Sequence, residues 1–332
     1  LTMRVPSDAA FGGVALPLAM RSSAGFFITP VTVARKLTIS TGIAYVEWKK
    51  TKINLLDTPG FNIFLNDTKM ALAAADSALV LVDGVAGVEV QTEKTFGFAD
   101  EFKLPRAFVI NKLDRERSSF ARTLESIHSV FGRMAVPIQL PIGSERDFKG
   151  VIDLIRMKAI TYTADGDGKG KESDIPADMA EAAQKAHEAL VEIVAEGKDE
   201  LMEEFFAEGT ISQEHIVAGL REEMSERRVY PVLCAALSHN VGTDLLLDFV
   251  SDYMPSGVAR GVVSGMVNGE PKDRKVSDSE PVSAYVFKTV ADPFAGRVTY
   301  FKVMSGIVKN DANLTNSRTG GGERLSHIGC LM

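Results

Sequence analysis

The segment PRAFVINKLDR, residues 105–115, runs from an apolar stretch into a polar turn, and it points to the fold class. Its apolar part, Ala107–Ile110, is one of four short apolar stretches; the others are Ile53–Leu56, Ala78–Val82 and Pro231–Cys234. Near-continuous apolar stretches of this length are typical of strands buried on both faces of a parallel sheet. Helix-sized segments, 66–76 and 92–102, separate the first three. The alternation predicts an α/β fold with a mainly parallel sheet covered by helices.

The composition excludes several classes of protein. The chain has 332 residues, of which 45% are apolar and 24% charged, and its formal net charge is −7. These values are ordinary for a globular protein and exclude disordered and collagen-like chains. The two cysteines, Cys234 and Cys330, lie far apart, which favours a reducing compartment and argues against structural zinc. The longest apolar segment, 70–90, contains three acidic residues and is not expected to span a membrane.

The segment DTPG, residues 57–60, follows the first predicted strand. A carboxylate such as that of Asp57 at the carboxyl end of a strand can hold Mg²⁺, usually through water. Gly60 lets the backbone approach a phosphate, so that its N–H can donate to a γ-phosphate oxygen. Since Pro and Gly are also common turn residues, this segment alone is equally compatible with a simple turn.

The segment NKLD, residues 111–114, follows the third predicted strand. The Asp114 carboxylate can accept two hydrogen bonds from the N1–H and the exocyclic amine of guanine, which adenine does not offer. The Asn111 amide can reach N7 and O6, and the Lys112 stem can cover the ring. Because ligands of parallel sheets bind at the carboxyl ends of the strands, the two segments together predict a guanine-nucleotide site.

The remaining chain predicts a helical insert and a second, all-β region. A helix is expected over 120–131, one or two strands over 151–162, helices over 175–228, and a last helix over 243–253. Residues 165–228 hold 18 acidic and 7 basic side chains, which form either a solvated face or a docking surface for a basic partner. A Gly-, Ser-, Asp- and Lys-rich linker follows, and an alternating pattern from Pro281 onward predicts the opening part of a β domain.

The chain resembles translation elongation factor G, a ribosome-dependent GTPase. The resemblance runs from about Arg35 to the end of the chain and is carried by INLLDTPG, LVLVDGVAGVEVQTEKTF, PRAFVINKLDR, GVIDLIRMKAITY, PVLCAALSHNVG and ADPFAGRVTYFKVMSG. It implies a P-loop-NTPase-like G domain at 34–256 with an insert subdomain at about 151–228. It also implies an atypical N-terminal segment at 1–33, a linker at 257–279 and the start of a β-barrel domain II at 280–332.

The resemblance further implies the ligands, partner and site residues. GTP or GDP and Mg²⁺ are the expected ligands, the ribosome is the expected partner, and the setting is a cytoplasmic monomer without membrane or DNA contacts. The implied Mg²⁺ ligands are Thr38 and Asp57. The implied GTP-binding residues are Asp57, Thr58, Pro59, Gly60, Phe61, Asn111, Lys112, Leu113, Asp114 and Ala236, the last through a backbone N–H to guanine O6.

Two departures from the family pattern affect the phosphate end of the site. The phosphate-binding loop G-x-x-x-x-G-K-[ST] does not occur in residues 1–33, so the chain resembles a divergent paralogue or a fragment that lacks this loop. In the switch segment, Lys36 stands where the family has Gly, whereas Thr38 keeps the hydroxyl.

Two further departures affect catalysis and base binding. Phe61 occupies the position of the catalytic His that positions water, and a phenyl ring cannot do this. Ala236 replaces a Ser of the base-contacting loop.

Two functions therefore remain open from the sequence. The chain is either a GTP-binding elongation factor that acts in translocation with slow hydrolysis, or a non-catalytic ribosome-associated module derived from a G domain. The five histidines are not paired with any nucleophile in the sequence, and we expect each to be structural or exposed; they are His128, His187, His215, His239 and His327.

Overall fold

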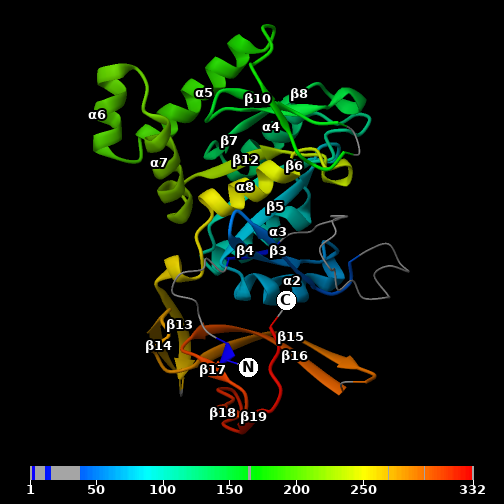
Figure 1. The fold of residues 1–332 in the computed structure, drawn as a ribbon, viewed down its shortest axis with the longest axis vertical. Coiled ribbons are helices and arrows are strands. Elements are labelled where there is room, and N and C mark those ends of the chain that lie inside the picture. The colour runs from blue at the N-terminus through cyan, green and yellow to red at the C-terminus, as the bar shows by residue number, and fades with distance from the viewer. Residues whose placement is uncertain are drawn as a thin grey trace.

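The computed structural model describes residues 2–3, 12–15, 38–163, 166–267, 269–294 and 296–330, with the first two segments as backbone only. A central α/β body lies between a helical insert at one end and antiparallel strands at the other (Figure 1). Within these described residues, no helix is long and apolar enough to cross a membrane.

The central body is built on a seven-stranded sheet of order β3-β4-β2-β5-β6-β12-β7. The antiparallel pair in this sheet is β3 with β4, and the other neighbours run parallel. The strands span Gly12–Ala15 (β2), Gly42–Trp48 (β3), Thr51–Asp57 (β4), Ser77–Asp83 (β5), Arg106–Asn111 (β6), Ala135–Pro137 (β7) and Tyr230–Cys234 (β12). The four apolar stretches are thus the cores of β4, β5, β6 and β12, as predicted.

Three strands of this sheet, β2, β3 and β7, lie outside the four predicted apolar stretches. β2 lies between β4 and β5, at the centre of the sheet and inside the segment 1–33 that was expected to be atypical. Its four residues, GGVA, are small and include two glycines, so they carry little of the apolar signal that marks the other strands. Residues 16–37, including Lys36, lie outside the described residues.

Helices cover both faces of the sheet, as expected of a parallel arrangement. They are α2 (Leu65–Ala74), α3 (Val90–Glu101), α4 (Phe120–Phe131) and α8 (Thr243–Tyr253). Alternate residues of β6 point to opposite faces: Ala107 and Val109 join the core that includes α8, whereas Phe108 and Ile110 join the core that includes α4. The ends of α4 are encoded locally, since the Ser119 hydroxyl accepts the Arg122 N–H and Gly132 ends the helix with φ +82°.

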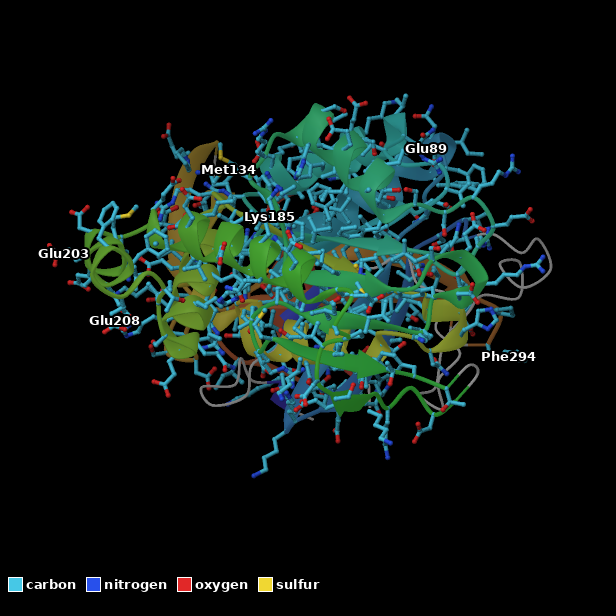
Figure 2. All side chains as sticks on the ribbon, turned by 90° about the horizontal axis from the view of Figure 1, so that it is seen from above. Glu89, Met134, Lys185, Glu203, Glu208 and Phe294 are labelled. Atoms are coloured by element: carbon cyan, nitrogen blue, oxygen red, sulfur yellow. The ribbon has the colours of Figure 1, made fainter. Side chains whose placement is uncertain are left out.

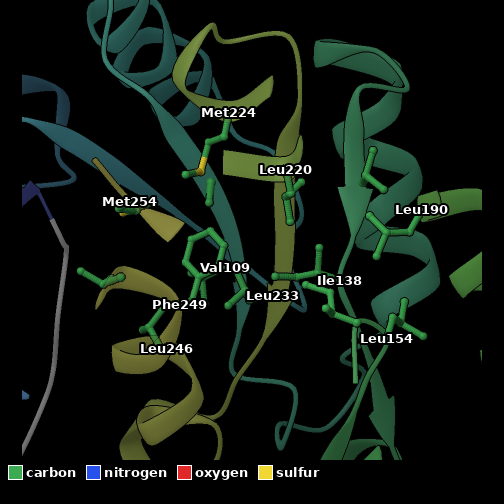
Figure 3. Packing of buried hydrophobic residues seen from close by; sticks show 14 of the residues in the cluster. Val109, Ile138, Leu154, Leu190, Leu220, Met224, Leu233, Leu246, Phe249 and Met254 are labelled. Carbon is green, nitrogen blue, oxygen red and sulfur yellow. The ribbon is translucent and has the colours of Figure 1, made fainter. Parts of the chain in front are cut away.

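The insert has a sheet of its own and shares the core of the central body. Its four strands, in the order β11-β10-β9-β8, are Lys171–Ser173, Lys158–Thr161, Gly150–Asp153 and Gln139–Ile142, and its helices are α5 (Ala180–Ala195), α6 (Asp199–Glu208) and α7 (Gln213–Ser225). The sheet therefore begins at Gln139, earlier than the predicted start near 151. Apolar side chains from β6, β12 and α8 continue without interruption into those of α5 and α7 (Figure 3).

The insert has exposed acidic side chains on both α5 and α6. Glu203 and Glu208 project at one extreme of the molecule, far from Phe294 at the other (Figure 2). Neither of the two interpretations of this acidity, a solvated face or a docking surface, is tested by the structure.

The C-terminal region consists of paired antiparallel strands. The pairs are β13 (Val262–Val267) with β14 (Glu270–Lys275), β15 (Ser283–Asp292) with β16 (Gly296–Ser305), β18 (Ala312–Thr315) with β19 (Gly322–Leu325), and β1 (Thr2–Met3) with β17 (Val308–Lys309). The strands expected after Pro281 are present. The segment 257–279, expected to be a linker, contains the β13–β14 hairpin; its residues are mostly exposed, so no buried face marked them as strands.

This C-terminal region packs on α2 through a cluster of aromatic and cationic side chains. Tyr285, Phe287 and Tyr300 lie against the buried core beneath α2. Lys302 forms an ion pair with Asp76, whose side chain is 2% exposed. Burial lowers the pKa of Lys302 despite this pair. The β15–β16 hairpin is therefore held against the central body by both apolar packing and a buried ion pair.

Candidate functional site

Four strands end at the same edge of the central sheet and place the predicted residues there. Asp57 ends β4, Asp83 ends β5, Asn111 ends β6 and Cys234 ends β12. Asp83 and Asn111 are paired in register. Because parallel sheets bind ligands at the carboxyl edge, the candidate site lies along this edge.

Asn111 joins the two loops on one side of the edge. Its Oδ1 accepts hydrogen bonds from the backbone N–H of Lys112 at 2.8 Å and of Leu237 at 3.1 Å. Leu113 is buried, and its N–H donates to the Ala235 carbonyl at 3.3 Å. Three hydrogen bonds therefore hold the NKLD segment in place. One lies within the segment, and two join it to the loop after β12.

Asp114 presents an acceptor without a partner. Among the described residues, its Oδ1 is buried and makes no hydrogen bond, whereas its Oδ2 lies 3.4 Å from His239 Nε2. A buried acceptor that lacks a donor is costly unless a ligand supplies one. The N1–H and amino group of guanine are donors of the required kind, so Asp114 fits the predicted base.

Lys112 is engaged by a carboxylate at the edge of the site. Its Nζ lies 2.5 Å from Asp83 Oδ2. Partial burial alone would raise the pKa of Asp83, but the hydrogen bonds from Lys112 and from the N–H groups of Val85 and Ala86 outweigh it and lower that pKa. The Lys112 stem is thereby held beside the edge, and the sequence analysis did not identify Asp83 as its partner.

Ala236 does not offer the N–H that was predicted to meet guanine O6. Its N–H donates to the Val241 carbonyl at 3.0 Å, and the Val241 N–H donates back at 3.2 Å. The bridge closes the loop after β12 and consumes this donor, so the predicted contact through Ala236 needs correction. The next N–H along the chain, that of Leu237, donates to Asn111 Oδ1.

On the other side of the edge, Thr38 and Asp57 lie together. The Thr38 hydroxyl donates to Asp57 Oδ2 at 3.4 Å. A hydroxyl and a carboxylate are the hard oxygen ligands that Mg²⁺ takes, and Mg²⁺ commonly completes its shell with water and phosphate oxygens. The described residues contain no group of three or more carboxylate, His or Cys side chains for a metal, so the fit holds only with such added ligands.

In the remainder of the DTPG segment, Thr58 and Pro59 are buried and Gly60 is exposed. The Pro59 carbonyl accepts the Thr68 hydroxyl at 2.7 Å. A Cβ at Gly60 would meet nothing within 4 Å. The backbone at Gly60 is therefore accessible to a phosphate.

Phe61 lies on the surface. Its side chain is 58% exposed, and its carbonyl accepts the Phe64 N–H at 2.9 Å at the start of a short 3₁₀ helix, Asn62–Phe64. Next to it, Asn62 Oδ1 accepts a hydrogen bond from Lys94 Nζ of α3 at 2.8 Å. The phenyl ring supplies no polar group to this end of the site.

A mainly parallel sheet with these turns at its carboxyl edge is an α/β fold whose ligand site is expected at that edge. Residues 19–256 match the family described as the elongation factor Tu GTP binding domain. Since this match covers more than half of the chain, the chain belongs to that family of translational GTPases.

A solved structure supports the fold beyond this domain. The chain is similar to the crystal structure of ttk003000868 from Thermus thermophilus, with a TM-score of 0.80 and 27% sequence identity. The match covers 96% of this chain and 49% of the Thermus chain, so the present chain spans about half the length of that protein.

Proposed function

We propose that this chain binds guanine nucleotides as a divergent paralogue of elongation factor G. The single observation that carries the proposal is the buried, unpartnered Asp114 Oδ1 beside the loops that Asn111 joins. In this proposal Asp114 recognises guanine, the Lys112 stem covers the base, and Leu113 supports the loop from the core. Family membership supports the choice of guanine nucleotide and of the ribosome as partner. The proposal further places the chain in the cytoplasm as a monomer.

At the phosphate end, Thr58 and Pro59 hold the turn that presents the Gly60 N–H to the γ-phosphate. Thr38 and Asp57 would hold Mg²⁺, which neutralises phosphate charge when it is bound. Nucleotide binding is expected to be weak because the segment 16–37 after β2 contains no G-x-x-x-x-G-K-[ST] sequence.

The strength of binding tests this proposal. Charge-assisted hydrogen bonds contribute about 1.5–3 kcal/mol each, so the loss of three or more corresponds to over three decades in affinity. A fluorescent GDP titration should therefore give a Kd above about 1 µM, and guanosine should compete whereas adenosine should not. Sub-micromolar GDP affinity would contradict the expected weakness, and equal competition by adenosine would contradict the guanine site.

A second function, a non-catalytic ribosome-associated module, is favoured by Phe61. The ring is exposed and apolar where water must be oriented for hydrolysis. Ribosome co-sedimentation separates the two functions: a module without turnover binds ribosomes equally with GDP, with a non-hydrolysable GTP analogue, or with neither, whereas a GTPase switch binds preferentially with the analogue.

A further inference from the structure

His239 lies beside the carboxylate that the proposed function assigns to guanine recognition. Its Nε2 is 3.4 Å from Asp114 Oδ2, while Asp114 Oδ1 is buried and unpartnered among the described residues. The two residues are far apart in the sequence, and the tertiary structure brings their side chains together.

The backbone that carries His239 is fixed by its own loop. The His239 N–H donates to the Ala236 carbonyl at 3.0 Å, and Asn240 closes the turn in the left-handed region with φ +57°. The buried Leu237 side chain and the Leu237–Asn111 hydrogen bond anchor the same loop to the core and to NKLD. The imidazole is 48% exposed, so it lies at the surface of the site and not in the core.

His239 can restrain the orientation of the Asp114 carboxylate. The carboxylate torsion of an Asp is broad, so an unrestrained Asp114 presents its two oxygens in many orientations. Each oxygen has two acceptor positions. An imidazole nitrogen 3.4 Å away can therefore restrain Oδ2 and still leave it able to accept from a ligand.

We infer that His239 is a positioning residue that orients Asp114 so that both oxygens meet the two donors of guanine. The inference rests on the proposed function and extends it to the 2-amino group of the base. Without His239, one of the two donors should lose its acceptor, and selectivity for guanine over hypoxanthine, which lacks the 2-amino group, should fall.

The experiment compares guanosine with inosine as probes, by ligand-detected NMR titration of the whole chain. The wild-type chain should bind guanosine at least about tenfold more tightly than inosine, as expected for one hydrogen bond to a charged acceptor. His239→Phe should lower this ratio to near one with inosine affinity changed less than about twofold. His239→Gln, whose amide can still donate to Asp114, should keep most of the ratio.

His215→Phe is the matched control. His215 on α7 is likewise half-exposed and faces a carboxylate, that of Glu204, but it lies in the insert. It should leave the ratio unchanged, and thermal unfolding should confirm that each variant is folded.

Three results would overturn the inference. They are an unchanged ratio in folded His239→Phe, equal weakening of both nucleosides, or equal loss of the ratio in His239→Phe and His239→Gln. A wild-type chain that binds neither nucleoside would contradict the proposed function itself and the inference with it.

Discussion

The base end and the phosphate end of the candidate site are built differently, although both lie at one edge of one sheet. At the base end, Asn111 joins two loops through short hydrogen bonds, and the buried side chains of Leu113 and Leu237 support them. At the phosphate end, the Thr38–Asp57 contact is 3.4 Å long and Phe61 is exposed.

In the proposed function, base recognition would use loops that the fold holds in place without a ligand, whereas phosphate recognition would depend on groups that this chain supplies sparsely. The base loops belong to the buried core, so their geometry is stabilised together with the sheet. The phosphate end has exposed backbone at Gly60, and the amino-acid sequence of residues 16–37 contains no phosphate-binding motif.

The largest expected effect comes from Phe61→His in a chimera whose segment after β2 carries a G-x-x-x-x-G-K-T loop. A ring nitrogen can orient water, so single-turnover GTP hydrolysis on saturating ribosomes should rise about 10²–10⁴-fold. GTP affinity should be nearly unchanged because the proposed γ-phosphate contact is that of Gly60. Phe294→His, which alters a 99% exposed Phe between the strands β15 and β16, is the control. Equal rates with and without the histidine would show that water is positioned by another group.

Asp114→Asn should give the next largest effect. An amide in place of the carboxylate places a donor opposite a guanine donor, so guanosine affinity should fall about 10²-fold, the equivalent of about 3 kcal/mol. Xanthosine, whose C2 carbonyl accepts from an amide, should gain affinity. Asp83→Asn, a matched change at the neighbouring strand end, should not alter the guanosine-to-xanthosine preference. If the preference is the same before and after Asp114→Asn, Asp114 does not read the base.

Asn111→Ala should lower stability as well as binding. Its loss leaves the N–H groups of Lys112 and Leu237 without their acceptor, at about 1–3 kcal/mol for a buried donor, so the free energy of unfolding should fall by about 2 kcal/mol. Urea unfolding measures this change. The control, Asn62→Ala at the phosphate end, removes only an exposed contact with Lys94 and should change stability by less than about 0.5 kcal/mol. An equal loss of unfolding free energy in Asn111→Ala and Asn62→Ala would show that the base end is not held more firmly than the phosphate end.

The smallest effect is a pH dependence from Asp83. Because its pKa is lowered in the folded chain, its contribution to stability is present above the ordinary value of 3.8 and is lost as the pH falls from there through the folded pKa. At pH 7, Asp83→Asn should cost about 0.2–1 kcal/mol, since the pair with Lys112 is partly exposed and screened by solvent. The difference between wild type and variant should shrink below pH 4 in urea unfolding. A difference that stays constant down to pH 2 would show that the ion pair contributes nothing.

Much of the fold was predictable because its signals are local. The four near-continuous apolar stretches were located as the buried strands β4, β5, β6 and β12, and the helix Thr243–Tyr253 was predicted with the bounds that the structure has. The DTPG and NKLD segments were predicted to share one edge from the rule that parallel strands end together, and the structure places Asp57 and Asn111 there.

Local sequence patterns did not predict strands that lack both an apolar stretch and an apolar–polar alternation. β2 is a central strand of small residues, and its place between β4 and β5 depends on pairing with strands far along the chain. The β13–β14 hairpin is exposed on both faces, so it lacks the alternation that marks a half-buried strand.

The amino-acid sequence by itself determined the strands β4, β5, β6 and β12, the helix α8 and the chemical character of the DTPG and NKLD turns, because side-chain size and polarity act within a few residues. Tertiary structure alone decided that His239 meets Asp114, that Asn111 accepts the Leu237 N–H, and that the Ala236 N–H is consumed by Val241. These contacts join separate loops or close one loop on itself. Their geometry is set by the packing of β6 beside β12, which no local pattern of residues expresses.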